Sequence, residues 1–177
     1  PTNVEQSDLH QAIFGSHGDS PRVVLAAASV EDCFYVAIEA ARIARKYSTP
    51  VFILSDTSLA TRIEAFDEPD LPKLMVDPKP DLTPRQTHKP YPIDQITQHV
   101  APGTRILDGK YPLLAGLEHD EMGHPTGSPK LHMAMTAKRR NKLRKLAEEI
   151  PVPEIHGNHE GTLMVGWGST YGPIHDA

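Results

Sequence analysis

The chain has 177 residues, a formal net charge of −5 and a single cysteine, and this length fits one domain, or one domain with part of another. The single cysteine excludes an intrachain disulfide and indicates a reducing compartment, and the acidic balance argues against nucleic acid as the main partner. Because no run approaches the length of about 18 apolar residues and the N-terminus lacks a signal-peptide pattern, we expect a soluble, cytoplasmic protein with no membrane partner.

The first third of the sequence predicts a helix, a strand, a second helix and a second strand in close succession. A short helix follows Ser7 or Asp8, and then come a buried strand at about 22–27, a helix at about 30–47 and a second strand at about 50–55. A strand, a helix and a strand with this spacing are typical of a right-handed parallel crossover. Parallel strands are buried on both faces and such a sheet needs more strands, so the two predicted here indicate an incomplete sheet. The apolar side of the first helix is expected to be Leu9, Ile13 and Phe14.

The central helix carries clear terminal signals. Ser29 suits the N-cap, Glu31 and Asp32 follow in the first turn, and Arg45 and Lys46 stand in the last turns, as the helix dipole favours. A broad face of small residues is expected to lie close to the sheet. These residues are Cys33, Val36, Ala37, Ala40, Ala41 and Ala44.

The rest of the chain is less regular. The 17 prolines gather mainly in the middle of the sequence, and a structureless segment of this length makes more sense as an arm that packs on another subunit. We therefore divide the chain into 1–65, an extended arm at 66–127, a helix and linker at 128–160, and the start of a second α/β unit at 161–177. Ser128 would cap the late helix, which has Pro129 in its first turn. Its shared apolar face would be Leu131, Met135, Leu143, Leu146 and Ile150.

Five features might carry chemistry, and each has a simpler interpretation. The turn "GWGSTYG" after the apolar run 163–165 resembles a phosphate cradle, but its glycine spacing differs from G-x-G-x-x-G, so close packing at a strand-to-helix turn is preferred. The histidines of "EHDEMGH" lack the metallopeptidase spacing and favour a polar loop over a metal site. The basic run 138–145 favours a solvated helix face over a nucleic-acid patch. Cys33 is expected to be a buried structural thiol, and Asp56 to cap the next helix.

Several stretches together resemble a known family. "PTNVEQSDL", the strand–helix–strand unit ending in "LSD", "GLEHDEMGHPT" followed by a basic helix, and "GWGSTYG" occur in this order. They are similar to the alpha subunit of 2-oxoacid:ferredoxin oxidoreductases, above all the 2-oxoglutarate type. The resemblance covers essentially the whole chain and implies an internal fragment of that subunit.

The resemblance implies a fold and a reaction. It implies an α/β fold with part of the parallel sheet of a thiamine-diphosphate (pyrimidine-binding) domain, a long arm, and the start of a domain like the C-terminal domain of transketolases. Thiamine diphosphate and Mg²⁺ would be shared with a beta subunit that carries the pyrophosphate-binding domain and an iron–sulfur cluster. Oxidative decarboxylation would give an acyl-coenzyme A and send electrons to ferredoxin, and a second alpha subunit would complete the assembly.

The resemblance also implies which residues lie near the cofactor. Thr2, Glu5 and Gln6 match the family loop beside the cofactor and substrate, although the residues around Ser7 would equally lead into the first helix. The family glutamate that contacts the aminopyrimidine is expected upstream of this segment, so no catalytic residue is assigned and no metal ligand is expected. Asn3 stands where the family often has a basic residue. We therefore expect the segment to be inactive alone.

Two functions remain open at this point. The first is a component of a thiamine-dependent oxidoreductase that works only with the rest of its complex. The alternative is a non-catalytic interaction or scaffold protein that retains the fold. The last apolar run, 163–165, is expected to be poorly ordered or to pair with another chain.

Overall fold

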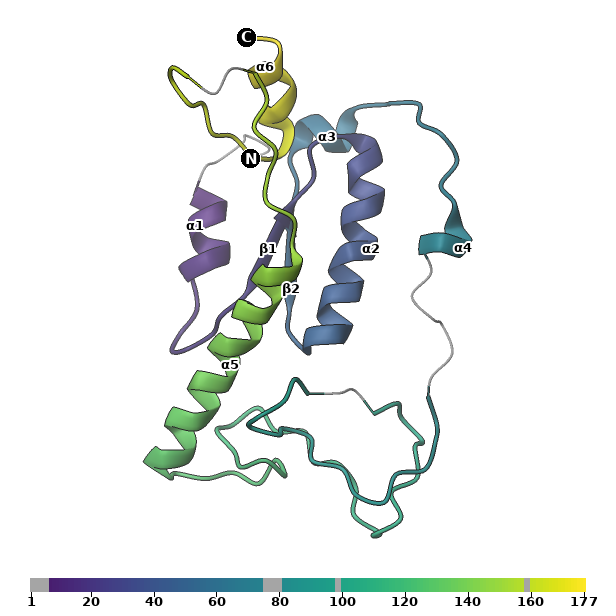
Figure 1. Cartoon of the computed structure of the whole chain (residues 1–177), viewed down its shortest axis with the longest axis vertical. Coiled ribbons are helices and arrows are strands. Elements are labelled where there is room, and N and C mark those ends of the chain that lie inside the picture. Colours follow the sequence, from purple (N-terminus) through teal and green to yellow (C-terminus); the bar gives the residue numbers. More distant parts are fainter. Residues whose placement is uncertain (1–6, 75–80, 98–99, 158–159) are drawn as a thin grey trace.

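A computed structural model describes residues 7–74, 81–97, 100–157 and 160–177. These residues form helices around one pair of strands (Figure 1). No helix of the described residues is long and apolar enough to cross a membrane. The elements in chain order are α1 (Ser7–Phe14), β1 (Val23–Ala26), α2 (Val30–Tyr47), β2 (Val51–Leu54), α3 (Thr57–Thr61), α4 (Leu71–Leu74), α5 (Pro129–Glu149), the 3₁₀ helix η1 (Gly168–Thr170) and α6 (Tyr171–His175).

The strand–helix–strand unit forms as the sequence predicts. β1 and β2 pair in parallel, with Val23 opposite Val51 and Ala26 opposite Leu54. The expected burial on both faces is wrong for β2, because Phe52 and Ile53 are 40% and 43% exposed. Adjacent strand residues point to opposite faces, so both faces of β2 leave apolar surface uncovered. A parallel sheet of only two strands is marginal without further partners.

The predicted caps of α2 are confirmed, but its buried face is shifted. The Ser29 hydroxyl accepts a hydrogen bond from the Asp32 amide at 3.0 Å. Ala37 and Ala41, expected to face the sheet, are exposed. The fully buried residues of the helix are Ala40, Ile43 and Tyr47. They follow the i, i+3, i+7 spacing of one helix face. The large side chains of Ile43 and Tyr47, rather than the row of alanines, determine which face of the helix is buried.

The core joins segments from both sides of the arm. Val23, Ile43, Tyr47 and Leu146 pack together. Leu146 belongs to α5, which crosses the lower part of the strand pair in Figure 1, while α2 flanks it. Burying such side chains contributes about 1.5–3 kcal/mol each. The late helix is therefore held on the early α/β unit by apolar packing.

Helix α5 begins and ends close to the predicted positions. The Ser128 hydroxyl accepts from the Leu131 amide at 3.5 Å, and Pro129 occupies the first turn. Met135 and Leu146 are buried, whereas Ile150 is 41% exposed at the end of the expected apolar face.

The basic run of α5 is only partly a solvated face. Arg140 and Lys145 are exposed, as expected. Lys138, Arg139 and Lys142 are half-buried, so the prediction is wrong for them. The reason is that this side of α5 faces other parts of the chain, where Arg139 contacts Asp19 and Glu118 and the two lysines reach the arm and the end of α2.

The arm has little regular structure but folds back on itself. A single short helix, α4, interrupts its described part. Arg85 and Ile106 form an isolated bridge, and the Tyr91 amide donates to the Glu121 carbonyl at 3.0 Å. The Tyr91 and His119 rings stack, with their centroids 3.7 Å apart. The backbone hydrogen bonds of the described part of the arm thus come mainly from local turns and isolated bridges rather than from a sheet.

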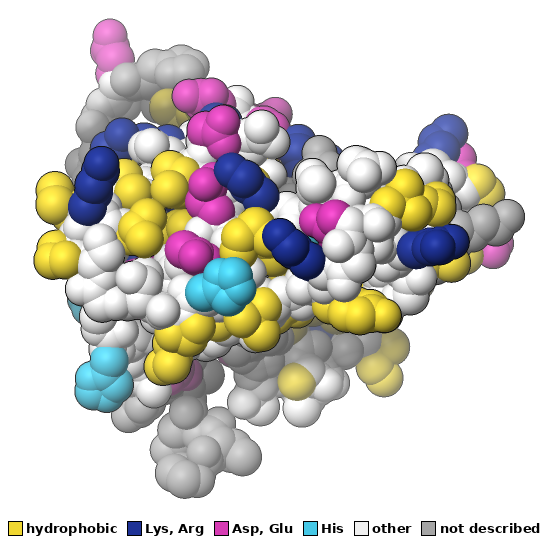
Figure 2. All heavy atoms as spheres, turned by 90° about the horizontal axis from the view of Figure 1, so that it is seen from below, with side chains coloured by type: hydrophobic (Ala, Val, Ile, Leu, Met, Phe, Trp, Pro, Cys, Tyr) yellow, Lys and Arg dark blue, Asp and Glu magenta, His cyan; other side chains and the backbone are white. Residues whose placement is uncertain are grey.

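The arm leaves much apolar surface exposed. Figure 2, which views the molecule from below, shows hydrophobic side chains gathered in patches among scattered charges. Tyr111 is 90% and Leu114 is 78% exposed. Exposed apolar patches of this kind mark interaction surfaces. Other large exposed apolar residues of the arm are Leu82, Leu107, Leu113 and Leu117.

We expect limited proteolysis of the isolated chain to cut first within residues 66–127. The described part of this segment has few regular hydrogen bonds and many exposed side chains, so its local opening needs little free energy. Peptide mapping of early digestion products would locate the cuts. Protection of the whole arm, with earlier cuts in α2 or α5, would contradict the expectation.

The C-terminal segment differs from the sequence prediction. Residues 163–165 were expected to be a strand that is poorly ordered or pairs with another chain; in the described chain they form no strand, and Val165 is 85% exposed. The described residues offer this segment no partner strand, and an extended chain without a ladder is not a strand. The helical turn that follows does form, as η1 and α6.

Candidate functional site

The carboxyl ends of the two parallel strands lie at one edge of the sheet, where α/β proteins place their ligands. Ser29 follows β1 and caps α2, and Asp56 follows β2 and caps α3. The Asp56 carboxylate accepts from the Leu59 amide at 3.0 Å, which confirms the capping role predicted for it. Hydrogen bonds from the Ser169 hydroxyl and from the Leu59 and Ser58 amides lower the pKa of Asp56, so it carries a negative charge at neutral pH.

The glycine-rich turn docks on this edge. The Ser169 hydroxyl donates a hydrogen bond to the Asp56 carboxylate across 113 residues of sequence. Gly168 has a φ of +64°, and a Cβ there would stand 3.6 Å from the Ala27 carbonyl oxygen at the end of β1. A side chain would fit at this position, so the reason for glycine here is the positive φ, which other residues rarely adopt.

At a second position of the same turn, close packing explains why the residue is a glycine. A Cβ at Gly166 would lie 2.2 Å from the Ile174 side chain and 2.8 Å from the Thr170 hydroxyl. The Thr170 hydroxyl in turn accepts from the Trp167 amide at 3.1 Å. The packing interpretation of "GWGSTYG" is therefore confirmed for Gly166. Helix α6 has only 5 residues, too few to form an anion site at its start.

The start of α2 is already occupied by side chains of this chain. The Ala28 amide donates to Asp32 at 2.8 Å, and the Val30 amide donates to Glu64 at 2.9 Å. Glu64 also pairs with Arg62. Amide groups at a helix N-terminus normally attract phosphate, but here carboxylates hold them and would repel a diphosphate.

The histidine-rich loop is a network of turns. Asp120 accepts from the Met122 and His124 amides at 2.8 and 3.0 Å. His119 bonds the Asp120 carbonyl, and His124 faces the Asp120 carboxylate at 3.3 Å. This arrangement is the polar loop that the sequence favours over a metal site. Within the part of the chain that the structure describes, no three His, Cys, Asp or Glu side chains gather in a way that could hold a metal ion.

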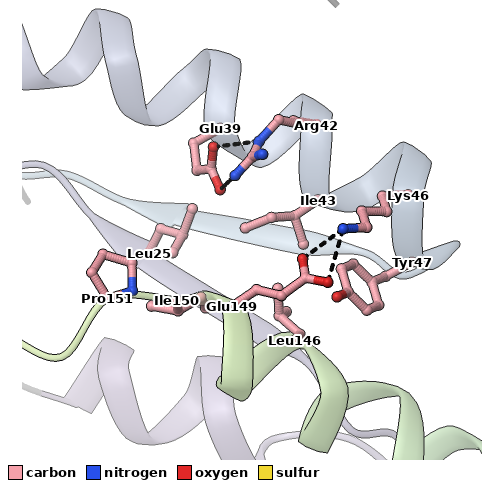
Figure 3. Close-up of a pocket in the computed structure, with 10 residues that line it drawn as sticks. All are labelled: Leu25, Glu39, Arg42, Ile43, Lys46, Tyr47, Leu146, Glu149, Ile150 and Pro151. Atoms are coloured by element: carbon pink, nitrogen blue, oxygen red, sulfur yellow. Dashed lines mark hydrogen bonds and ion pairs between the residues drawn. The ribbon is translucent and has the colours of Figure 1, made fainter.

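A pocket of about 420 Å³ lies between α2 and the end of α5 (Figure 3). Leu25 and Ile43 give it an apolar floor, and the Lys46–Glu149 ion pair closes one side at 2.6 Å. Burial and the neighbouring Glu149 carboxylate raise the pKa of Tyr47 to about 12, so its phenol stays protonated. The charges at the rim are already paired with each other, so the pocket offers a ligand mainly apolar surface.

The residues predicted to lie beside a cofactor cannot be placed. Thr2, Glu5 and Gln6 lie outside the described residues. Cys33, expected to be buried, is half-buried. Sequence reasoning missed Glu64 and Ser169, whose partners are 34 and 113 residues away. No local pattern could have signalled these two contacts.

Sequence comparison decides the family. The model of the pyruvate flavodoxin/ferredoxin oxidoreductase, thiamine-diphosphate-binding family matches residues 1–138. The chain belongs to this family. The match includes the strand pair, α2 and the arm, so these elements form part of a thiamine-diphosphate-binding family domain.

Curated relatives agree with this membership. The chain is 38% identical to the 2-oxoglutarate oxidoreductase subunit KorA of Mycobacterium tuberculosis over 100% of its own length and 27% of that protein. It is 34% identical to the alpha subunit of 2-oxoacid:ferredoxin oxidoreductase 2 of Aeropyrum pernix, of which it covers 28%. The chain thus spans little more than a quarter of the length of these family members, which are subunits of enzyme complexes.

A solved structure extends the likeness to the fold. The 2-oxoglutarate:ferredoxin oxidoreductase of Magnetococcus marinus, with 2-oxoglutarate, coenzyme A and succinyl-CoA bound, matches with a TM-score of 0.85 and 37% identity. The match covers 99% of this chain and 31% of that one. The α/β fold with its parallel strands is therefore the fold of this oxidoreductase family, as the sequence resemblance predicts.

Proposed function

We propose that the chain is part of the alpha subunit of a thiamine-diphosphate-dependent 2-oxoacid:ferredoxin oxidoreductase that acts on 2-oxoglutarate. The observation that carries the proposal is the likeness in fold and sequence over 99% of the chain to an oxidoreductase that binds 2-oxoglutarate and coenzyme A. The reaction is oxidative decarboxylation to an acyl-coenzyme A, with electrons passed to ferredoxin. The chain contributes one wall of the site and does not act alone.

The described residues do not by themselves fit the cofactor. Asp32 and Glu64 accept the hydrogen bonds of two amides at the start of α2, so these amides are not available to a diphosphate, and the described side chains include no group of three that could hold a metal ion. In this proposal thiamine diphosphate and Mg²⁺ are shared with the beta subunit, and the iron–sulfur cluster is carried by the beta subunit. The role of this chain is to place Thr2, Glu5 and Gln6 beside the cofactor.

The arm at 66–127 is proposed to contact neighbouring subunits of the complex. Its exposed apolar side chains, such as Tyr111 and Leu114, support this role. Large exposed apolar patches are rare on monomeric soluble proteins and mark interaction surfaces. The segment at 161–177 is proposed to lead into the next domain. Its contact with Asp56 would fix the direction in which that domain leaves the thiamine domain.

The direct test is an assay of the assembled complex. The alpha subunit that contains this chain, purified with a beta subunit, is expected to reduce ferredoxin when 2-oxoglutarate and coenzyme A are both present, and to form one acyl-coenzyme A and one CO₂ for every two electrons that reach ferredoxin. Pyruvate in place of 2-oxoglutarate is the matched control for substrate choice. An assembled complex that reduces ferredoxin with neither acid would contradict the proposal and favour a scaffold role.

Calorimetry tests whether this chain binds thiamine diphosphate without the other subunit. The chain alone is expected to bind thiamine diphosphate poorly with or without Mg²⁺, because its own carboxylates cover the amides at the start of α2. The assembled complex serves as the positive control. Tight, Mg²⁺-dependent binding to the isolated chain would show that its residues suffice.

A further inference from the structure

The hydroxyl group of Tyr47 is buried without a hydrogen-bond partner. Tyr47 is 1% exposed, and its hydroxyl makes no hydrogen bond to any of the described residues. Burial and the nearby Glu149 carboxylate raise the pKa of this phenol, but both oxygens of that carboxylate are held by the Lys46 amine, at 2.8 and 2.6 Å. Buried polar groups in proteins are nearly always paired, so an unpaired hydroxyl at this depth requires an explanation.

This hydroxyl belongs to the wall of the pocket between α2 and the end of α5. Figure 3 shows the Tyr47 ring beside Ile43, with its hydroxyl end turned toward Leu146 and the other lining residues. Apart from the charged side chains at its rim, the pocket is lined by apolar groups. These are Leu25, Ile43, Leu146, Ile150 and Pro151. A volume of about 420 Å³ and an apolar lining with one placed polar group are typical of a site for a small molecule.

The charges at the rim limit what the pocket can hold. Arg42 donates to the two Glu39 oxygens at 2.8 and 2.6 Å, and Lys46 binds both oxygens of Glu149 in the same way. Each pair is neutral, so a charged ligand gains little from it. A peptide segment would bring amide N–H groups that need acceptors, and all four carboxylate oxygens already accept hydrogen bonds. A molecule that accepts one hydrogen bond and donates none fits the lining better.

We propose that this pocket binds an uncharged, mainly apolar small molecule whose acceptor oxygen, such as a ketone carbonyl, takes the hydrogen bond of the Tyr47 hydroxyl. The phenol can only donate to such a group, because its pKa of about 12 keeps it protonated at neutral pH. The apolar body of the ligand covers Leu25 and Ile43. This proposal does not depend on the proposed function of the chain.

The test is an NMR titration of the full chain with 1-indanone, a ring ketone, and with indane, which has the same rings and no oxygen. Saturable shifts of the Ile43 and Leu146 methyl signals are expected with both probes. Tyr47→Phe removes only the hydroxyl, so it should weaken 1-indanone binding about three- to tenfold and leave the affinity for indane unchanged. Tyr35→Phe makes the same change on α2 outside the pocket lining, and should alter neither affinity.

Chemical denaturation of the free chain gives an independent measurement. Because the hydroxyl is unpaired in the free chain, Tyr47→Phe keeps the packing and removes a polar group without a partner. The denaturation midpoint should therefore stay equal or rise. A lower midpoint would show that the hydroxyl is already paired and would overturn the proposal. The proposal also fails if 1-indanone gives no saturable shifts, or if Tyr47→Phe weakens both probes equally.

Discussion

Replacing Met135 by alanine is expected to lower the free energy of unfolding by about 2–5 kcal/mol. The Met135 side chain is 2% exposed, so truncation removes buried apolar surface and leaves a cavity in a site that can only partly collapse. Chemical denaturation of the full chain, followed by circular dichroism, measures the change.

Met133 provides a control on the same helix. Met133→Ala removes the same atoms and introduces the same alanine two residues away, but the Met133 side chain is 73% exposed, so little buried surface is lost. The expected loss is below about 0.5 kcal/mol. Equal effects of the two substitutions would contradict the burial of the Met135 side chain.

Replacing Asp56 by alanine is expected to lower the free energy of unfolding by about 2–4 kcal/mol, because one carboxylate both caps a helix and accepts a hydrogen bond from a distant segment. It caps α3 through the Leu59 amide at 3.0 Å and accepts the Ser169 hydroxyl. Ser169→Ala removes only the second contact, and the double substitution measures the coupling between the two residues. Ser58→Ala, at an exposed position of α3, should change stability little. Purely additive effects of Asp56→Ala and Ser169→Ala would contradict a direct contact.

The same carboxylate predicts a pH dependence. The pKa of Asp56 is lowered in the folded chain, chiefly by the hydrogen bond from Ser169 and also by that from the Leu59 amide. Its contribution is therefore complete above the unfolded pKa of about 3.9 and is lost as the pH falls through the lower folded value. Asp56→Asn keeps an acceptor oxygen but does not titrate in this range. The stability difference between the two proteins should be constant near neutral pH and shrink in strong acid; a difference that grows with acidification would contradict this.

Local signals explain why the strand–helix–strand unit could be predicted from the sequence. Ser29 and Asp56 each stand directly before a helix and bond an amide three residues ahead, so their roles depend on neighbours in the sequence. The apolar runs of β1 and β2 are equally local. The buried face of α2 was misplaced because a row of alanines suggests close packing, whereas the burial of Ile43 and Tyr47 depends on Leu146, more than 90 residues later.

The parts that sequence reasoning missed depend on contacts between distant segments. Nothing near Val30 indicates that Glu64 will accept its amide, and nothing near Asp56 indicates Ser169. Lys138 and Lys142 look like part of a solvated basic face, but Thr97 of the arm accepts a hydrogen bond from Lys138 and the Ser48 carbonyl after α2 accepts one from Lys142. The unpaired run at 163–165 fails as a strand for the same reason, because strand formation requires a partner that a single segment cannot specify.

The core cluster of Val23, Ile43, Tyr47 and Leu146 draws on both sides of the arm, and so does the contact between Asp56 and Ser169. The covalent connection through residues 66–127 is thus not what holds α5 and the C-terminal turn on the α/β unit. A chain cut once in the arm would remain a single noncovalent particle, and two separately made pieces, divided in the arm, carry the complementary surfaces needed to reassemble.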